Sequence, residues 1–251
     1  MVLGSDAAMS VDRRMRLWSQ LVERSGGEKV TIEHVCAAAI SAAGVDGAAV
    51  TVMLPASPRE TLYASDSAAS ELEELMLTLG EGPGVDAGTG GPALVADLAA
   101  SECLARWPIF APAAVQAGVR AMFALPLAVG VIRLGVFDLY RAQAGGLERD
   151  LLGDLLLLAD TACALLLDTG SAAGVRLHGD GPAQAGLQHP EVHQATGMLI
   201  VQLGVTAAVA LMRLRAYAYT NERRLQDVAS DVVARRLRFH PDVGVQGSGA
   251  E

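Results

Sequence analysis

One twenty-residue segment divides the chain and limits how it can fold. Residues 169–188 (TGSAAGVRLHGDGPAQAGLQ) contain five glycines and one proline and show no sustained apolar periodicity. Such stretches are typical of linkers, because they favour neither a continued helix nor a paired strand. We therefore predict a front part that ends at residue 168 and a smaller unit at 189–240, followed by a disordered tail at 241–251.

The net charge of the chain divides at the same segment. The 251 residues carry a net charge of −9. Residues 186–240, however, hold seven arginines against four acids, which gives +3 and leaves −12 for the remainder. A charge difference between two parts of one chain indicates that the basic part binds a polyanion. The smaller unit is therefore the candidate for nucleic-acid binding.

Apolar segments and cysteines indicate a soluble, cytoplasmic protein without a membrane partner. The most apolar run, 151–167, contains Gly153, Asp154 and Asp160, whereas a spanning helix needs about 20 residues with few charges. The N-terminus lacks a basic region followed by an apolar core, which a secretory signal requires. The three cysteines form no CxxC pair and do not make a closed set of disulfides.

Apolar periodicity predicts an α+β fold for the front part. Helices are expected at 11–24 (within an N-terminal segment 1–27), 30–43, 67–79, 107–118 and 147–168. Strands are expected at 47–54, 61–65, 92–98, 119–130 and 131–141, the last two as a hairpin around Gly130, and the glycine-rich segment 80–92 is expected to be a long loop. The helix at 147–168 is apolar on nearly every side, so it should pack across the sheet or join another subunit.

The front part shows no recognisable catalytic, metal or cofactor site. It contains no GxxxxGK[ST], GxGxxG, HExxH or GxSxG motif, and its only histidine is His34. Lys29 is the only lysine of the chain, which argues against a phosphoacceptor receiver domain, because that site requires a lysine at the end of its last strand. We predict no catalytic residue, no metal ligand and no cofactor. Turnover of a small molecule by the front part remains an alternative.

Four segments of the front part resemble GAF domains, in the variant found in actinobacterial two-domain regulators. They are LGEGPGVDA (79–87), PALVADL (92–98), RWPIFAPAAVQAGVRAMFALPLAVG (106–130) and RLGVFDLYR (133–141). The resemblance covers 28–168 and implies a sensor and dimerisation domain, with an antiparallel sheet flanked by helices. The two long strands place four apolar residues where they either line a ligand pocket or fill the core: Met122, Ala124, Phe137 and Leu139. Nothing in the sequence identifies a ligand.

The smaller unit is predicted to be all-α, with three helices. The first follows Pro190 and ends at Gly204, because proline suits a first helical position and glycine suits a helix end. Thr206 is a natural N-cap for the second helix. The third is expected at 224–238, where Arg235, Arg236 and Arg238 would favour the dipole at its C-terminal end.

This unit resembles the ANTAR domain, the RNA-binding module of transcription antiterminators. The matching residues are HPEVHQATGMLIVQLGVTAAVALMRLRAYAYTNERRLQDVASDVVARRL (189–237), without a gap. Ala195 and Gly197 match an AKG-like element of the family. Thr196 and His189 depart from the pattern, because the family often has lysine and arginine there.

Candidate RNA contacts follow from side-chain chemistry and from this resemblance. Basic side chains meet phosphates, whereas aromatic rings and amides recognise splayed loop bases. Tyr219 is a further ring that could stack on a base. The predicted RNA-binding residues are Gln194, Thr196, Gly197, Arg213, Arg215, Tyr217, Asn221, Arg223 and Arg224.

The resemblances together imply a regulator that binds paired stem-loops in nascent RNA and prevents premature transcription termination. Two loops need two modules, so a homodimer is expected, with 11–24 and 147–168 as dimer surfaces. A small-molecule ligand of the front part would shift the equilibrium between RNA-competent and incompetent arrangements. Two alternatives stay open: a DNA-binding regulator with 224–238 as recognition helix, and a small-molecule-binding signalling protein without a nucleic-acid role. Base contacts in the DNA alternative would come from Gln226, Asp227 and Ser230.

Overall fold

The computed structural model describes residues 3–53, 59–172 and 189–240. These residues divide into two compact units, one built from 3–53 and 59–172 and the other from 189–240. Most of the predicted linker (173–188) and the predicted disordered tail (241–251) lie outside the described residues.

The first unit is built on a five-stranded antiparallel sheet with the strand order β2-β1-β5-β4-β3. The strands are β1 (Gly47–Val52), β2 (Glu60–Ala64), β3 (Ala93–Val95), β4 (Ala121–Val129) and β5 (Ile132–Arg141). The predicted hairpin is confirmed, because β4 and β5 pair on either side of Gly130, whose φ of +60° suits glycine. β5 lies at the centre of the sheet, between β1 and β4.

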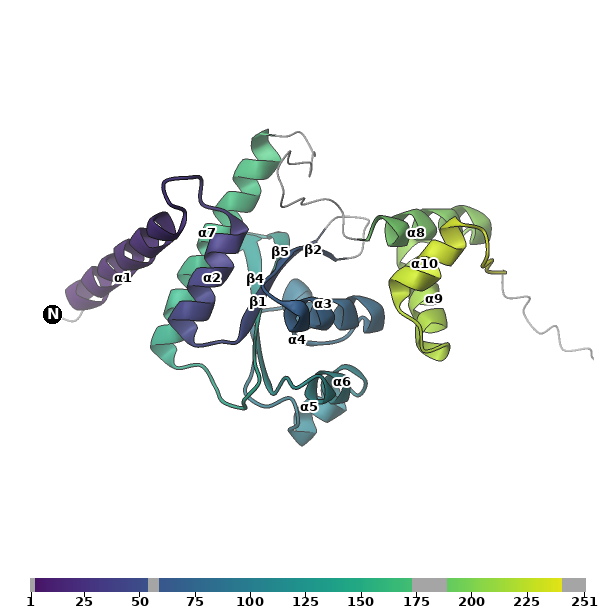
Figure 1. Cartoon of the computed structure of the whole chain (residues 1–251), viewed down its shortest axis with the longest axis horizontal. Helices are drawn as coiled ribbons and strands as arrows, with labels where there is room; N and C mark the ends of the chain where they lie inside the picture. Colours follow the sequence, from purple (N-terminus) through teal and green to yellow (C-terminus); the bar gives the residue numbers. More distant parts are fainter. Residues whose placement is uncertain (1–2, 54–58, 173–188, 241–251) are drawn as a thin grey trace, which may run out of the picture. The chain divides into compact units, whose positions relative to one another are not determined.

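Helices cover both faces of this sheet, as the resemblance implied (Figure 1). One face carries α2 (Ile32–Ala43) and α7 (Arg149–Ala172), and α1 (Leu3–Arg24) contacts these two helices. The other face carries α3 (Ser67–Leu79) and α4 (Pro83–Thr89), with α6 (Phe110–Gln116) packed against α3 and α5 (Ser101–Arg106) beside α6.

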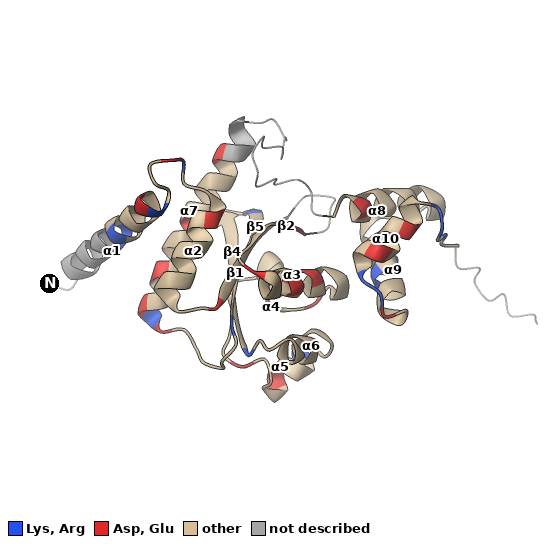
Figure 2. Cartoon of the chain, viewed as in Figure 1, with Lys and Arg blue, Asp and Glu red and all other residues tan. Residues whose placement is uncertain are grey.

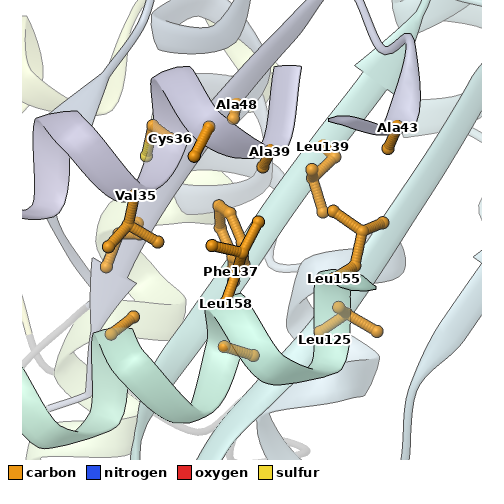
Figure 3. Close-up of a cluster of buried hydrophobic side chains, with 14 of the residues drawn as sticks. Val35, Cys36, Ala39, Ala43, Ala48, Leu125, Phe137, Leu139, Leu155 and Leu158 are labelled. Carbon is orange, nitrogen blue, oxygen red and sulfur yellow. The ribbon is translucent and has the colours of Figure 1, made fainter. Parts of the chain in front are cut away.

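The larger hydrophobic core lies between the sheet and the helices α2 and α7. Phe137 and Leu139 project from β5 into this layer, opposite side chains of both helices (Figure 3). Residues labelled in the figure that share this cluster are Val35, Cys36, Ala39, Ala43, Ala48, Leu125, Leu155 and Leu158. All are at most 4% exposed, so this layer fixes both helices against the sheet.

The prediction of a long loop at 80–92 is wrong, because α4 occupies Pro83–Thr89. Pro83 opens the helix at a position where its missing N–H costs nothing. A Cβ at Gly84 would lie 2.6 Å from Asp138 Oδ1, and one at Gly88 would lie 2.9 Å from Met53 Sδ. These glycines therefore allow a short helix to approach the sheet closely, whereas the sequence pattern suggested a turn. The sequence also gave no sign of α5.

Only part of α7 is buried. Leu155, Leu158 and Ala162 pack across the sheet, as predicted for an apolar helix, but Leu156 and Leu167 are 43% and 46% exposed. The helix therefore buries one face within this chain and presents a second apolar face to its surroundings.

The second unit is a bundle of three helices, α8 (Pro190–Leu203), α9 (Ala207–Thr220) and α10 (Leu225–Val233). Gly204 ends α8 with a φ of +67°, and the Thr206 hydroxyl caps α9 by accepting from the Val209 N–H, as predicted. Alanine supplies much of the core: Ala195, Ala210, Ala218 and Ala229 are fully buried beside Val192, Leu199, Leu214, Leu225, Val228 and Val232.

The third helix is shorter than predicted. It ends at Val233, and residues 234–240 continue without helix, with Arg235 at a φ of +60°. The three arginines of this segment therefore lie beyond the helix, so they do not form a basic last turn.

Among the described residues, no single helix combines the length and apolarity needed to cross a membrane. The pair α8 and α9 reaches that threshold only when the two are taken together, and they are bent by 110° at their junction.

Gly135 should be intolerant of any side chain. A Cβ at this position would lie 2.0 Å from the Thr51 carbonyl oxygen of the neighbouring strand. We expect Gly135→Ala to lower the free energy of unfolding by about 1–3 kcal/mol or more, as overpacking does. Urea denaturation measures it.

Gly146→Ala is the matched control, because nothing lies within 4 Å of a Cβ there. It should stay within about 1 kcal/mol of the wild type. Equal stability of the two variants would contradict the close approach of β1 and β5.

Candidate functional sites

The four residues predicted to line a ligand pocket do not share a face of the sheet. The register pairs Met122 with Tyr140, so Met122 and Ala124 face α3 and α4. Phe137 and Leu139 face the opposite way, into the layer of α2 and α7. The prediction of a single pocket is therefore wrong: all four residues are at most 1% exposed and belong to cores on two sides of the sheet.

The face that carries α3 holds a cavity of about 10 Å³. That volume is about the minimum for one water molecule, whereas small-molecule sites typically measure about 300–1,000 Å³. Among the described residues, core side chains therefore fill most of the space beside this cavity. The cavity is lined by Ala49, Ala69, Leu72, Glu73, Met122, Asp138, Leu139 and Tyr140.

Beside this cavity lies a buried ionic cluster of Arg59, Glu73 and Asp138, which sequence reasoning missed. Arg59 Nη2 donates to Glu73 Oε2 at 3.1 Å and to Asp138 Oδ2 at 3.0 Å. The Thr51 hydroxyl donates to Glu73 Oε2 at 2.6 Å. The two carboxylate side chains are 3% exposed and that of Arg59 is 10% exposed. One signal was available, because Asp138 interrupts the otherwise apolar run VFDLY.

The cluster holds two carboxyl groups against one guanidinium, so full ionisation would leave a buried negative charge. Burial and the neighbouring Glu73 carboxylate raise the pKa of Asp138 well above its ordinary range, and Arg59 offsets only part of this rise. One oxygen of each carboxyl group, Glu73 Oε1 and Asp138 Oδ1, has no hydrogen-bond partner in the described chain. The arrangement therefore favours a proton on Asp138.

In the second unit, most of the predicted RNA-binding residues line two surface hollows. The first hollow, of about 570 Å³, lies between α8 and the segment that follows α10. Gln194 and Gly197 line it from α8, and both are exposed. The other residues of the first hollow are Met198, Val201, Gln202, Val232, Arg235, Leu237 and Arg238.

The second hollow, of about 500 Å³, follows one face of α9. Arg213, Tyr217 and Asn221 line it at the spacing of successive helical turns. The Asn221 amide also donates to the Tyr217 carbonyl at 2.8 Å, which helps to hold the end of the helix. The remaining lining residues of the second hollow are Ala216, Thr220, Phe239 and His240.

Thr196 does not lie on this surface, contrary to prediction. It is 4% exposed, and its hydroxyl donates to the Val192 carbonyl at 2.7 Å. Its side chain faces the core, so it is not positioned to contact phosphate. His189, the other departure from the family pattern, is 9% exposed and precedes α8 as its N-cap residue.

The remaining predicted arginines differ in their surroundings. Arg223 forms an ion pair with Asp231 at 2.8 Å, which ties the turn after α9 to α10. Arg224 is exposed at the N-cap of α10, and Arg215 is half-buried on α9. Figure 2 shows basic residues at the turn before α10 and along the segment after it.

Comparison with known proteins gives a family match for the second unit and a fold for the first. Residues 184–233 match the model of the ANTAR domain, a family of RNA-binding modules of transcription antitermination regulators. The first unit is similar to the GAF domain of an Acinetobacter phosphoenolpyruvate-protein phosphotransferase, with 11% identity and a TM-score of 0.50 over 66% of this chain and 98% of that one. The corresponding GAF domain from Coxiella burnetii gives 14% identity and a TM-score of 0.50, over 64% and 96%. The chain joins a GAF-fold domain to an ANTAR domain.

The likeness of the GAF-fold domain shows its fold alone, because the sequence identities are so low. Among curated proteins, none matches this chain. ANTAR domains are regulatory modules. Within the described residues, no group of three His, Cys, Asp or Glu side chains is arranged to hold a metal ion.

Replacing Asp138 should change how the stability of the GAF-fold domain depends on pH. A carboxyl group whose pKa is raised by folding stabilises the fold at low pH, and this contribution is lost as pH rises through the raised pKa. We expect the free energy of unfolding of the wild type to fall relative to that of Asp138→Asn as pH is raised from about 4, the ordinary pKa of a carboxyl group.

Urea titrations at a series of pH values measure this difference. The control is Asp160→Asn, which removes an exposed carboxylate of α7. A difference between wild type and Asp138→Asn that stays constant with pH would show that Asp138 is not protonated in the folded protein.

Proposed function

We propose that this protein is an RNA-binding regulator that prevents premature transcription termination, in which the GAF-fold domain controls the ANTAR domain. The observation that carries the proposal is the ANTAR match at residues 184–233. Its targets are paired stem-loops in nascent RNA, whose formation excludes a terminator hairpin. The protein acts in the cytoplasm and is not an enzyme.

The surface of the ANTAR domain supports an RNA ligand. Arg213 and Arg224 offer guanidinium groups to phosphates, and Tyr217 offers a half-buried ring in the same hollow as Arg213. Gln194 and Asn221 are exposed amides with the donors and acceptors that base edges require. Single-stranded loops are recognised by this combination of stacking and edge contacts. A local charge of only +3 favours recognition of loop shape over a purely electrostatic attraction.

The protein works as a homodimer in this proposal, because two loops require two ANTAR domains. The apolar residues Met15, Trp18 and Val22 recur at helical spacing on α1 and are 65%, 53% and 44% exposed. α7 adds its own exposed side chains, Leu156 and Leu167. Exposed apolar stripes of this kind mark association surfaces, so the two helices are the proposed contact between copies.

Control by the GAF-fold domain requires a ligand that prefers one of two conformations. The cavity of about 10 Å³ is too small for such a ligand. A small molecule acting on this face would therefore have to displace core side chains and select a more open state.

The DNA-binding alternative finds less support on α10. Gln226 and Ser230 are half-buried, and the exposed Asp227 places a carboxylate on the helix that would enter the groove. Carboxylates near the phosphates of a duplex repel them. No observation in the described residues favours this alternative.

RNA preference and the role of Arg224 can be tested together. The full chain is used to select tandem-hairpin RNAs from a pool with randomised loops, and the selected RNA is compared with duplex DNA of the same sequence. We expect binding to the RNA and weak binding to the DNA. Arg224→Ala should weaken RNA binding and reduce the slope of log affinity against log salt by about one.

Arg133→Ala is the control, because Arg133 is an exposed arginine of the GAF-fold domain. It should leave affinity and slope near those of the wild type. Equal binding to RNA and duplex DNA would favour the DNA-binding alternative, and failure to select any RNA would refute the proposal.

Dimerisation through α1 is tested with Trp18→Lys. A charge placed in the centre of an apolar contact should raise the dimer dissociation constant more than about tenfold, as loss of a hot-spot residue does. Size-exclusion chromatography with light scattering measures the mass. Val131→Lys is the control, since Val131 is 95% exposed at the β4–β5 hairpin. A Trp18→Lys protein that remains dimeric would exclude this surface.

A further inference from the structure

We propose that residues 234–240 form a basic and aromatic arm that completes the RNA-binding surface of the ANTAR domain. The arm (ARRLRFH) follows the last residue of the ANTAR match. In this assignment Phe239 provides a second ring for an unpaired base beside Tyr217, and Arg235 and Arg238 contact phosphates. The inference rests on the proposed function and adds ligand contacts that the family match does not supply.

The start of the arm is fixed by a turn at the end of α10. Arg235 takes the left-handed conformation, which redirects the chain. The N–H groups of Arg236 and Leu237 both donate to the Asp231 carbonyl, at 2.8 and 3.1 Å. The Arg236 guanidinium also pairs with the Asp231 carboxylate at 2.7 Å. The arm therefore leaves the helix in a defined direction.

The far end of the arm is held by the other two helices. The Gln202 amide on α8 donates to the Phe239 carbonyl. Arg213 on α9 donates to the His240 carbonyl at 3.4 Å. The rings of Phe239 and Tyr217 meet edge to face, with their centroids 5.5 Å apart. The arm thus contacts all three helices and is a folded part of the domain.

Its course makes the arm a wall of both hollows. Arg235, Leu237 and Arg238 line the first hollow, opposite Gln194 and Gly197. Phe239 and His240 then line the second hollow, together with Arg213, Tyr217 and Asn221. The predicted RNA contacts of α8 therefore lie across the first hollow from the arm, and those of α9 lie with the arm in the second hollow.

The charge of the arm identifies its role. A segment that blocked an RNA site by imitating RNA would be acidic, whereas this one carries three arginines and a histidine and no acid. Arg236 is engaged with Asp231, but no ion pair is formed by Arg235 or Arg238 within the described chain, and both are exposed. Their charges add to those of Arg213 and Arg224, so the arm attracts phosphates.

The aromatic pair supplies a place for a base. Phe239 and Tyr217 are both half-buried, and both line the second hollow, so each ring keeps surface open to a planar ligand. Stacking on such rings is tolerant of sequence, because every base has a π face. The adjacent Asn221 amide and Arg213 guanidinium offer hydrogen bonds to the edge of a stacked base. The chemical class of ligand is an unpaired nucleobase of an RNA loop.

The test measures the affinity of full-length variants for the tandem-hairpin RNA selected by the wild type. Phe239→Leu keeps an apolar side chain against Tyr217 but removes the ring. It should weaken binding about fivefold or more, as the loss of one stacked base does. Arg238→Gln should reduce the slope of log affinity against log salt by about one. Ultraviolet crosslinking followed by peptide mapping should place RNA on the peptide that contains Phe239.

Two control variants separate the arm from general effects. Met212→Ala removes a 59% exposed apolar side chain of the same domain that lines neither hollow, and Arg133→Gln removes one charge from the other domain. Both should bind as the wild type does. Circular dichroism melting curves show whether each variant is folded.

The outcomes distinguish the arm from the function on which it rests. If the wild type selects no RNA, both the proposed function and the inferred role of the arm are refuted. If the wild type binds RNA but Phe239→Leu and Arg238→Gln bind equally well with unchanged slopes, the arm alone is refuted. Tighter binding by Phe239→Leu would show that the arm covers the site, which also overturns the proposal.

Discussion

The contact of Arg59 with two buried carboxyl groups organises one whole face of the GAF-fold domain. Arg59 precedes the edge strand β2, Glu73 belongs to α3, and Asp138 lies on the central strand β5. α4 approaches so closely that its Gly84 has no room for a side chain beside Asp138 and Arg59. Removing Arg59 or Glu73 would leave the other as an unpaired buried charge, which usually costs about 3–5 kcal/mol. The cluster therefore ties the start of β2 to α3 and to the central strand, and α4 packs directly beside it.

The same cluster borders the small cavity that the described residues leave on this face. Apolar side chains such as Met122 and Leu72 fill the volume beside it. A polar cluster specifies geometry more strictly than apolar packing does, because each donor and acceptor has a required direction. A conformational change on this face must either keep the cluster intact or exchange its partners for those of a ligand.

Much of the fold could be predicted from local sequence patterns. The hairpin at Gly130 and the α3 helix at Ser67–Leu79 agree with the predicted ranges, because period and turn chemistry are local properties. The pocket was mispredicted for a different reason. Met122 and Phe137 are both apolar strand residues, but only the pairing register, which links distant residues, decides which face each one occupies. α4 was missed because its glycines are needed for close packing against the sheet, a tertiary requirement that the local sequence pattern does not show.

The surface of the ANTAR domain shows the same limit. Family spacing identified exposed residues such as Gln194 and Asn221, yet it also pointed to Thr196, which the packing of α8 turns inward. The ion pair between Arg223 and Asp231 and the contact between Phe239 and Tyr217 join residues that no helical repeat connects. Tertiary contacts of this kind decide which side chains are free to meet a ligand, and a linear pattern does not record them.

The alanine core of the ANTAR domain has a consequence for how this domain can evolve. Ala195, Ala210, Ala218 and Ala229 are fully buried between the three helices. Substitution by a smaller residue is unfavourable at these positions, because only glycine is smaller than alanine and it destabilises a helix by about 1 kcal/mol. Larger residues would push the helices apart. The core of the ANTAR domain therefore tolerates few substitutions. Adaptation to a new RNA must come almost entirely from changes in the surface side chains that border the two hollows.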